Sequence, residues 1–314
     1  MKIIVESHIP FISGILENAG HSVTYLPPEE ITAKSVGEAD ALIVRTRTRC
    51  DSQLLDGSKV SLIATATIGT DHIDLDYCRR RGIRVSNAPG CNAPAVAQYV
   101  LSAIGRVRPG LRPTIGIVGV GHVGSTIKRW AGANDFPTLL CDPPLGMPAT
   151  LADIAANADI ITFHTPLDET TRHMADAAFF AACRRRPIVI NAARGPVVET
   201  GALIDALKAG SISDAVIDCW ENEPRISAEL LDLAAIATPH IAGYSIQGKR
   251  RATAMALHAI DPSIDIAIDP VAPAPTLDEI TASYDPLADT DNLRANPAEF
   301  EALRNRYAFR KEPE

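Results

Sequence analysis

The chain has 314 residues, of which 46% are hydrophobic and 22% are charged, and its formal net charge at pH 7 is −8. This length exceeds that of most single domains, so at least two domains are expected, and the composition is that of an ordinary globular protein. The acidic balance argues against non-specific nucleic-acid binding, and the lack of a run of about 18 apolar residues argues against a membrane-spanning helix.

The cysteines and the amino terminus favour a cytoplasmic protein. Six cysteines are scattered through the chain without a C-x-x-C spacing. This pattern argues against a zinc site or a disulfide framework and suits a reducing compartment. Residues 1–6 have the pattern of a buried strand rather than the apolar stretch of a signal peptide. We therefore expect a cytoplasmic location and no bound metal.

Residues 1–92 alternate between strand and helix patterns, which is typical of a parallel α/β domain. Short apolar runs predict strands at 2–6, 22–26, 40–45, 62–67 and 84–87. A helical pattern then extends to about Val107 and leads the chain into a second domain.

The centre of the second domain is a strand pattern at 114–118 that leads into the motif G-x-G-x-x-G. A helical pattern at 126–133 follows, then a strand pattern at 137–141 that ends on an aspartate. This order of strand, glycine turn, helix, strand and acid is that of a dinucleotide-binding unit.

Each part of that unit has a physical role. The glycines permit a tight turn, close approach of a pyrophosphate and close packing of the helix on the sheet. The helix N-terminus offers N–H groups and a positive dipole end to the phosphates, and the acid can accept hydrogen bonds from the adenosine ribose. The residues expected to bind the dinucleotide here are Gly119, Gly121, His122, Val123, Gly124 and Asp142.

The α/β rhythm continues to about residue 240. Further strand patterns lie at 159–164, 187–191, 214–218 and 236–240. In open parallel sheets, ligands bind beyond the carboxyl ends of the strands. The polar residues that follow these strands, which we expect in one crevice, are Thr165, Arg194, Asp218, Glu223 and His240.

From residue 261 the pattern changes, because prolines interrupt a stretch of little periodicity. The helical pattern at 297–306 would place Phe300, Leu303 and Tyr307 on one face. We interpret residues 261–314 as an appendage. Since this apolar face is too small to fold alone, we expect it to lie at the interface of a homodimer.

Several motifs together resemble the D-isomer-specific 2-hydroxyacid dehydrogenases. They are the glycine motif and the stretches 69–74, 191–195, 218–224 and 239–243, which appear in that family's order. The resemblance implies two doubly wound parallel-sheet (Rossmann-like) α/β domains with a short C-terminal appendage. The substrate-binding domain would comprise 1–92, completed by about 243–260, and the NAD-binding domain 93–242. The segment 261–314 would be the dimerisation segment.

The resemblance also implies the activity and further site residues. The stretches that most resemble the branch of the family that uses NAD to oxidise 4-phospho-D-erythronate, on the route to pyridoxal 5′-phosphate, are 64–72, 89–93, 139–144, 162–166 and 240–244. The further residues that would line the cofactor are Thr165, Ala192, Ala193, Arg194, Asp218 and Gly243. Those that would touch the small phosphorylated substrate are Arg45, Thr46, Thr67 and Tyr244.

Oxidation of a 2-hydroxy acid requires a base for the hydroxyl proton while hydride leaves C2. Histidine titrates near neutral pH, and His240 is the candidate base. Glu223 would hydrogen-bond the imidazole and favour its charged form. Arg194 would bind the substrate carboxylate and polarise the C2 oxygen.

The run Arg45-Thr46-Arg47-Thr48-Arg49 predicts a site for the substrate's phosphate. In an extended strand alternate side chains share a face, so the three arginines could point together. Thr46 would point the other way unless the strand ends there. Arg45 and Thr46 match the family pattern, whereas Arg47 does not, and a solvated basic edge stays an open alternative.

Two other interpretations stay open. One is a D-2-hydroxyacid dehydrogenase with a different substrate, such as D-3-phosphoglycerate. The other is a non-catalytic NAD-binding scaffold. Retention of Arg194, Glu223 and His240 counts against the scaffold, and NADH production would exclude it.

Overall fold

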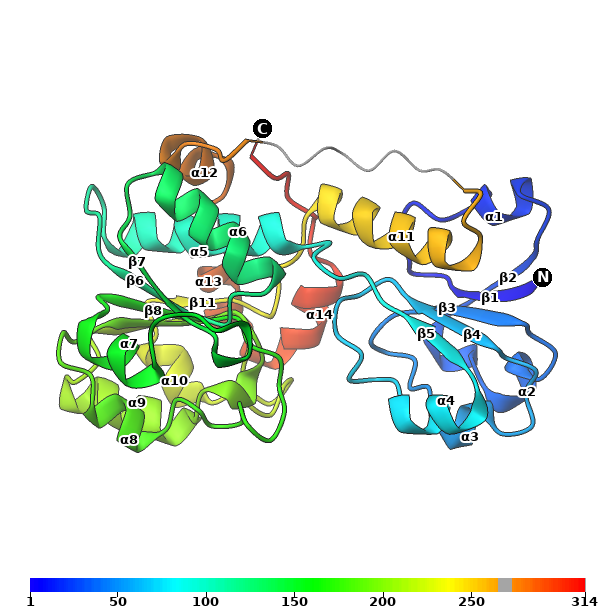
Figure 1. Ribbon diagram of the computed structural model, residues 1–314, viewed down its shortest axis with the longest axis horizontal. Helices are drawn as coiled ribbons and strands as arrows, with labels where there is room; N and C mark the ends of the chain where they lie inside the picture. The colour runs from blue at the N-terminus through cyan, green and yellow to red at the C-terminus, as the bar shows by residue number, and fades with distance from the viewer. Residues whose placement is uncertain (265–272, 314) are drawn as a thin grey trace. The chain divides into compact units, whose positions relative to one another are not determined.

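The computed structural model describes residues 1–264 and 273–313, and the chain divides into two compact units (Figure 1). The first comprises Met1–Asn92 with Ile246–Val271, and the second Ala93–Ser245 with Ala272–Glu314. Each unit is built on one parallel sheet, so the expected class of two doubly wound α/β units is confirmed. In the described part of the chain, no helix has the length and apolarity needed to cross a bilayer.

The first unit has a five-stranded parallel sheet in the order β2-β1-β3-β4-β5. Its strands are β1 Lys2–Glu6, β2 Ser22–Leu26, β3 Ala41–Val44, β4 Leu62–Thr65 and β5 Arg84–Ser86. Its helices are α1 Ile15–Asn18, η1 Pro28–Glu30, α2 Ala33–Val36, α3 Ser52–Leu55, α4 Leu75–Arg81 and α11 Ile246–Ile260. The strand order reverses between β1 and β3, and the carboxyl ends there form a switch point where ligands bind in such sheets.

Alternation along the strands divides the first unit's core between two faces. On one face, Ile3 and Ile43 pack with Leu257 of α11. On the other, Leu42 packs with Leu55 of α3. Because both faces are covered, the strands are apolar at nearly every position, as the sequence patterns indicated.

The second unit has a six-stranded parallel sheet in the order β11-β10-β9-β8-β6-β7. Its strands are β6 Ile115–Val118, β7 Thr138–Cys141, β8 Ile160–Phe163, β9 Ile188–Asn191, β10 Asp214–Ile217 and β11 Ile236–Ala237. The chain moves from β6 outward to β7 and then crosses to β8 on the other side. The switch point of this sheet therefore lies at the carboxyl ends of β6 and β8.

Helices cover both faces of this second sheet. They are α5 Ala93–Val107, α6 His122–Ala133, η2 Pro143–Leu145, α7 Leu151–Asn157, α8 Ala177–Ala181, η3 Gly195–Val197, α9 Thr200–Ala209, α10 Ala228–Leu233, α12 Leu277–Ser283, α13 Pro286–Ala295, η4 Pro297–Glu299 and α14 Phe300–Asn305. Figure 1 shows α5, α6 and α12 on one side of the sheet and α7 to α10 on the other, and the two core clusters divide in the same way.

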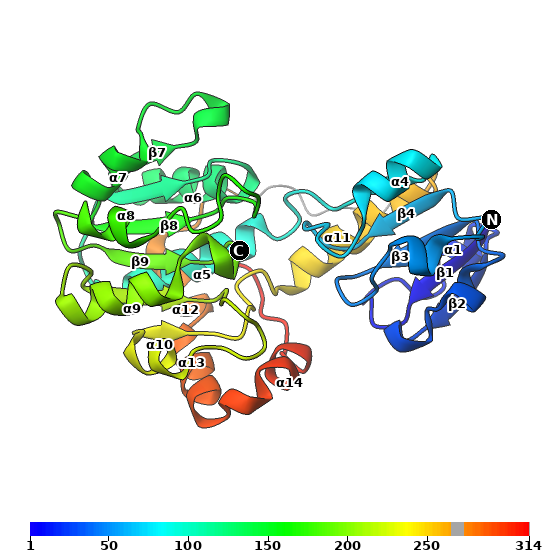
Figure 2. The same ribbon diagram turned by 90° about the horizontal axis from the view of Figure 1, so that it is seen from below.

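The C-terminal residues are part of the second unit, which corrects the expectation of a separate appendage. Leu293 and Phe300 are fully buried in one core cluster of the sheet, and Ile280 is fully buried in the other. Figure 2 shows α13 and α14 beside α10, at the edge of the sheet opposite β7. Of the three residues on which we base the expected dimer interface, Phe300 is thus buried in the chain's own core, whereas Leu303 and Tyr307 are partly exposed. Its short, proline-interrupted pattern did not reveal which core it joins.

Candidate active site

The glycine turn after β6 has the geometry that a dinucleotide requires. Gly119 has a φ of +88°, and a Cβ there would lie 2.7 Å from the His164 carbonyl carbon. A Cβ on Gly124 would lie 2.0 Å from the Gly119 oxygen. A Cβ on Gly121 would meet nothing within 4 Å, and α6 begins at the next residue. The fold therefore requires glycine at positions 119 and 124. Gly121 leaves open space in front of a helix N-terminus, where a pyrophosphate fits.

Asp142 lies beside this turn, at the end of β7. Its Oδ2 accepts a hydrogen bond from the Val120 N–H at 2.7 Å, and its Oδ1 accepts one from the Leu145 N–H at 3.3 Å. The carboxylate is half-buried and held in place by backbone donors. This position agrees with the expected contact to the adenosine ribose, which stays a prediction.

The other expected cofactor residues also lie in the second unit. Each lies just after the carboxyl end of a strand. Thr165 follows β8, Ala192 and Ala193 follow β9, and Gly243 lies in the turn after β11. Because all strands are parallel, these positions share one edge of the sheet. Their contact with NAD stays a prediction.

Glu223 and His240 form a hydrogen-bonded pair. His240 Nδ1 lies 2.9 Å from Glu223 Oε2 and 3.0 Å from Oε1, and the Trp220 N–H donates to Oε1 at 2.9 Å. Burial alone would raise the pKa of Glu223, but the groups around the carboxylate, His240 first among them, hold that pKa below its usual value. With Nδ1 bound to Glu223, Nε2 is the nitrogen that can take a proton from a substrate.

Asp218 holds the turn that carries His240. The residue is 1% exposed; its Oδ1 accepts from the Thr238 hydroxyl and the Ile241 N–H, both at 2.7 Å, and its Oδ2 accepts from the Ala242 N–H at 3.0 Å. Burial raises the pKa of this carboxyl against the opposing effect of these donors. His240 has a φ of +57°, which few non-glycine residues adopt. Asp218 therefore fixes an unusual backbone conformation at His240, and its expected cofactor contact stays a prediction.

Arg194 follows β9 and is half-buried, and its Nη1 donates to the Ala193 carbonyl at 2.9 Å. The next residue, Gly195, lies against the loop that carries Glu223. A Cβ on Gly195 would stand 1.9 Å from the Trp220 carbonyl oxygen. In the sequence, Gly195 was only the last residue of the motif 191–195. The close approach of the Trp220 carbonyl explains why this position requires glycine.

Cys219, Glu223 and His240 place one possible ligand atom each within 4.8 Å of the others. A thiol, a carboxylate and an imidazole are zinc ligands. However, burial raises the pKa of the Cys219 thiol well above its usual value, and the thiol donates to the Ala193 carbonyl at 3.3 Å. The other two side chains are bonded to each other. The chemistry of this cluster therefore favours an acid–base pair, and the expectation of no metal stays a prediction.

In the first unit, Arg45 and Thr46 lie at the switch point between β1 and β3. The sheet strand ends at Val44, and residues 45–48 form a turn, so the three arginines do not share a face. Arg45 Nε donates to Oε1 of the fully buried Glu6 at 3.1 Å, whereas the exposed Arg49 pairs with Asp51 at 2.8 Å. This corrects the expected row of arginines and leaves Thr46 exposed at the turn.

Thr67 belongs to a small polar network at the end of β4. Its hydroxyl lies 2.7 Å from that of Thr65, which in turn lies 3.1 Å from His72 Nε2. Burial lowers the pKa of His72. Glu6 and His72, which no sequence argument placed in a site, thus support two of the expected substrate residues. The signals in the sequence were, for Glu6, a single carboxylate at the end of an apolar run and, for His72, its place in the stretch 69–74.

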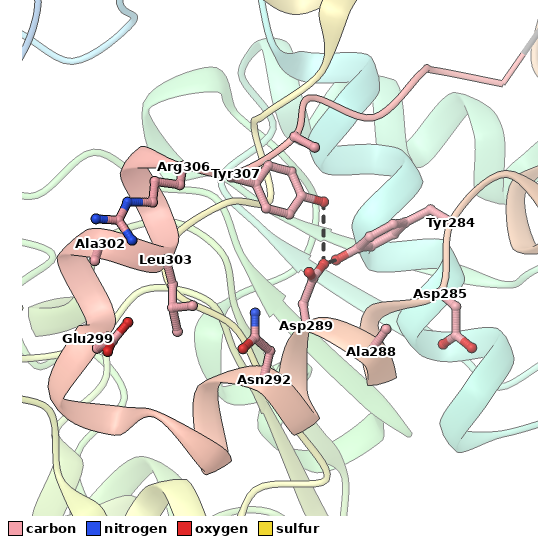
Figure 3. Close-up of a pocket in the computed structure, with 11 residues that line it drawn as sticks. Tyr284, Asp285, Ala288, Asp289, Asn292, Glu299, Ala302, Leu303, Arg306 and Tyr307 are labelled. Atoms are coloured by element: carbon pink, nitrogen blue, oxygen red, sulfur yellow. Dashed lines mark hydrogen bonds between the residues drawn. The ribbon is translucent and has the colours of Figure 1, made fainter.

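A pocket of about 450 Å³ lies elsewhere in the second unit, between α13 and α14 (Figure 3). The Tyr284 and Tyr307 hydroxyls converge on the Asp289 carboxylate, at 2.8 Å and 3.3 Å. Burial raises the pKa of Asp289. The pocket contains none of the expected site residues, so it is distinct from the candidate active site.

Comparisons with known proteins indicate the family that the sequence motifs resemble. Residues 111–242 match the model of the "D-isomer specific 2-hydroxyacid dehydrogenase, NAD binding domain". An erythronate-4-phosphate dehydrogenase of Bacteroides thetaiotaomicron is 45% identical, and the alignment covers 99% of this chain and 97% of the relative. A protein of the same name from Cronobacter sakazakii is 39% identical, with 99% and 92% covered.

Solved structures share the fold. The TT0316 protein of Thermus thermophilus has a TM-score of 0.70 and 28% identity over 83% of this chain and 97% of its own. The NAD⁺-bound 3-phosphoglycerate dehydrogenase of Entamoeba histolytica has a TM-score of 0.71 and 23% identity, over 87% and 99%. At that identity the likeness concerns the fold alone.

Proposed function

The chain belongs to the D-isomer-specific 2-hydroxyacid dehydrogenase family, and on that premise we propose that it oxidises 4-phospho-D-erythronate to 2-oxo-3-hydroxy-4-phosphobutanoate in pyridoxal 5′-phosphate biosynthesis. Family membership makes it an NAD-dependent oxidoreductase, as the sequence predicted. The specific substrate is supported by the names of relatives that align with nearly the whole chain. The observation that carries the chemistry is the hydrogen-bonded pair of Glu223 and His240.

The residues of the second unit divide the reaction between them. Arg194 binds the substrate carboxylate, and His240 takes the C2 hydroxyl proton at Nε2 while Glu223 stabilises the imidazolium. NAD, when bound, accepts the hydride that leaves C2. Tyr244 donates a hydrogen bond to the substrate.

We propose that the cofactor is held by the residues gathered at the carboxyl edge of the second sheet. The glycine turn and the N-terminus of α6 would bind the pyrophosphate, and Asp142 would bind the ribose. The remaining contacts would come from Thr165, Ala192, Ala193, Arg194, Asp218 and Gly243.

The enzyme is expected to prefer NAD to NADP by on the order of 100-fold in kcat/KM, because Asp142 would repel a 2′-phosphate and like charges in contact cost several kcal/mol. Asp142→Asn should narrow this preference because it removes the charge that repels the 2′-phosphate. The turn should persist in this variant, since an amide oxygen can still accept from the Val120 N–H. Steady-state kinetics with both cofactors measure the ratio. Equal efficiencies in the unmodified enzyme would contradict the role of Asp142.

The substrate's phosphate is proposed to bind Arg45 and Thr46. 4-Phosphoerythronate should be oxidised at least about 100-fold more efficiently than erythronate, because a phosphate gains charge-assisted hydrogen bonds that a hydroxyl cannot make. NADH formation over a panel of phosphorylated and plain 2-hydroxy acids, D-3-phosphoglycerate included, tests this. Equal rates with erythronate would leave only the general dehydrogenase function, and no NADH with any acid would favour a scaffold.

Thr46→Val is a sharper probe of the phosphate site than Arg45→Ala. Removing the Arg45 side chain would take the counter-charge from the buried Glu6, which would keep only its hydrogen bonds from the residue 45 N–H and the Thr48 hydroxyl, so the variant should lose stability. Thr46 is exposed, and its loss should raise KM for the phosphorylated acid about tenfold. Arg49→Gln is the matched control, because Arg49 is engaged with Asp51. An equal effect of both variants would favour the solvated basic edge.

A homodimer and a cytoplasmic location complete the proposal. The dimer is supported by the family resemblance, because Phe300, the centre of the apolar face on which we base the dimer interface, is buried in the chain's own core. Equilibrium sedimentation of the full chain tests it, and a monomer at micromolar concentration would exclude it. The location is supported by the six cysteines, each of which carries a free thiol.

A further inference from the structure

Arg304 connects the C-terminal segment to the Glu223–His240 pair. It lies on α14, its side chain is 20% exposed, and its Nη1 lies 3.9 Å from Glu223 Oε2. Its Nε donates to the Tyr244 hydroxyl oxygen at 3.3 Å. One guanidinium therefore contacts the carboxylate behind the expected base and the tyrosine expected to touch the substrate.

We propose that Arg304 is a positioning residue of the active site. Its charge keeps the Glu223 carboxylate ionised and limits how strongly that carboxylate favours the protonated imidazole of His240. Its Nε–H directs the hydroxyl of Tyr244. The proposal rests on the proposed function, because it concerns the same base and the same substrate contact.

The charge argument depends on everything that faces Glu223. An opposite charge within about 4–6 Å favours the ionised carboxyl, and partial exposure weakens this effect through solvent screening. Arg304 also lies 3.7 Å from Glu301 on its own helix, so part of its charge is compensated. The other charged and titratable groups gathered around the pair and around Arg304 are Arg194, Asp218, Cys219, Tyr244 and Glu301.

The Tyr244 argument is one of hydrogen-bond direction. Guanidinium groups only donate, so the hydroxyl oxygen of Tyr244 accepts from Arg304 and its own proton points to another acceptor. The Tyr244 ring also packs edge-on against Tyr307 and Phe309, at centroid distances of 6.2 Å and 6.1 Å. The C-terminal segment thus fixes both the ring and the hydroxyl. A fixed O–H donor suits an anionic substrate.

The same segment is anchored to the turn that follows His240. Arg310 is 9% exposed and donates from Nη1 to the Ile241 carbonyl at 3.0 Å. Glu312 accepts from the Ser245 hydroxyl at 2.6 Å. The chain therefore holds α14 and the His240 turn together, which gives Arg304 a defined position beside the pair.

The test compares Arg304→Gln and Arg304→Lys with Arg306→Gln, a matched control at the exposed residue that directly follows α14. Loss of the charge leaves Glu223 less compensated, so protonated His240 is favoured. The acidic limb of the kcat/KM profile should then move to higher pH by roughly half a unit, which lowers kcat/KM on that limb about threefold. Arg304→Lys should restore the limb and leave KM raised, because an ammonium does not reproduce the Nε contact to Tyr244.

A second readout does not depend on turnover. NMR titration of the His240 imidazole in the substrate-free protein should show the same shift in Arg304→Gln, and none in Arg306→Gln. Unchanged titration in a folded Arg304→Gln protein, or an equal shift in Arg306→Gln, would overturn the proposal. If the panel of acids gives no NADH but the imidazole titration shifts, the proposed function fails while the positioning role of Arg304 stands.

Discussion

Replacing His240 by asparagine is expected to abolish oxidation of the 2-hydroxy acid while leaving NADH binding nearly intact. General base catalysis typically contributes about 10²–10⁴-fold, so kcat should fall by at least that factor. Asparagine tolerates a positive φ, so the backbone at φ +57° can persist. NADH affinity, measured by fluorescence titration, should change little because the glycine turn is untouched. Turnover within about tenfold of the unmodified enzyme would remove His240 from the role of base.

Glu223→Gln provides the control for the role of charge at this pair. The glutamine oxygen can still accept from the Trp220 N–H, so the loop should persist and the loss of turnover should be milder. Without the carboxylate the imidazolium is less favoured, and the acidic limb of the rate profile should move to lower pH. Arg304→Gln moves the same limb to higher pH. The opposite signs separate loss of the carboxylate from loss of its counter-charge.

The sequence predicted the strands of both sheets well because each is a short apolar run buried on two faces. It also placed Glu223 and His240 at the same sheet edge, since both follow the carboxyl ends of parallel strands. Their hydrogen bond confirms that these two side chains meet. A regular repeat of strands and helices leaves few alternatives for where such residues lie.

Contacts between distant, irregular segments could not be predicted in this way. Residues 297–306 gave a helical pattern, but only the structure shows Phe300 in the core and Arg304 beside Glu223. Likewise, alternation suggested a row of arginines after β3, whereas the strand ends and Arg45 turns to the buried Glu6. From the sequence, a single carboxylate at the end of an apolar strand does not indicate which residue it will pair with.

Gly195→Ala is the second substitution expected to have a large effect. The added Cβ would lie 1.9 Å from the Trp220 oxygen, 2.1 Å from its carbonyl carbon and 2.5 Å from the Glu221 nitrogen, all of them backbone atoms. No rotamer can relieve this contact, so the turn that carries Arg194 and the loop that carries Glu223 must separate. Such overpacking typically costs about 1–3 kcal/mol or more.

The functional cost of Gly195→Ala should exceed its cost in stability. A displacement of about 1 Å in a catalytic group can lower turnover about 10²-fold, and here both Arg194 and Glu223 stand on the displaced segments. Gly201→Ala in α9 is the matched control, because a Cβ there meets nothing within 4 Å and alanine favours a helix. Thermal unfolding and kcat/KM are measured for both variants. Near-normal turnover of Gly195→Ala would show that the two segments need not touch for catalysis, whereas equal damage by Gly201→Ala would trace the loss to α9 instead.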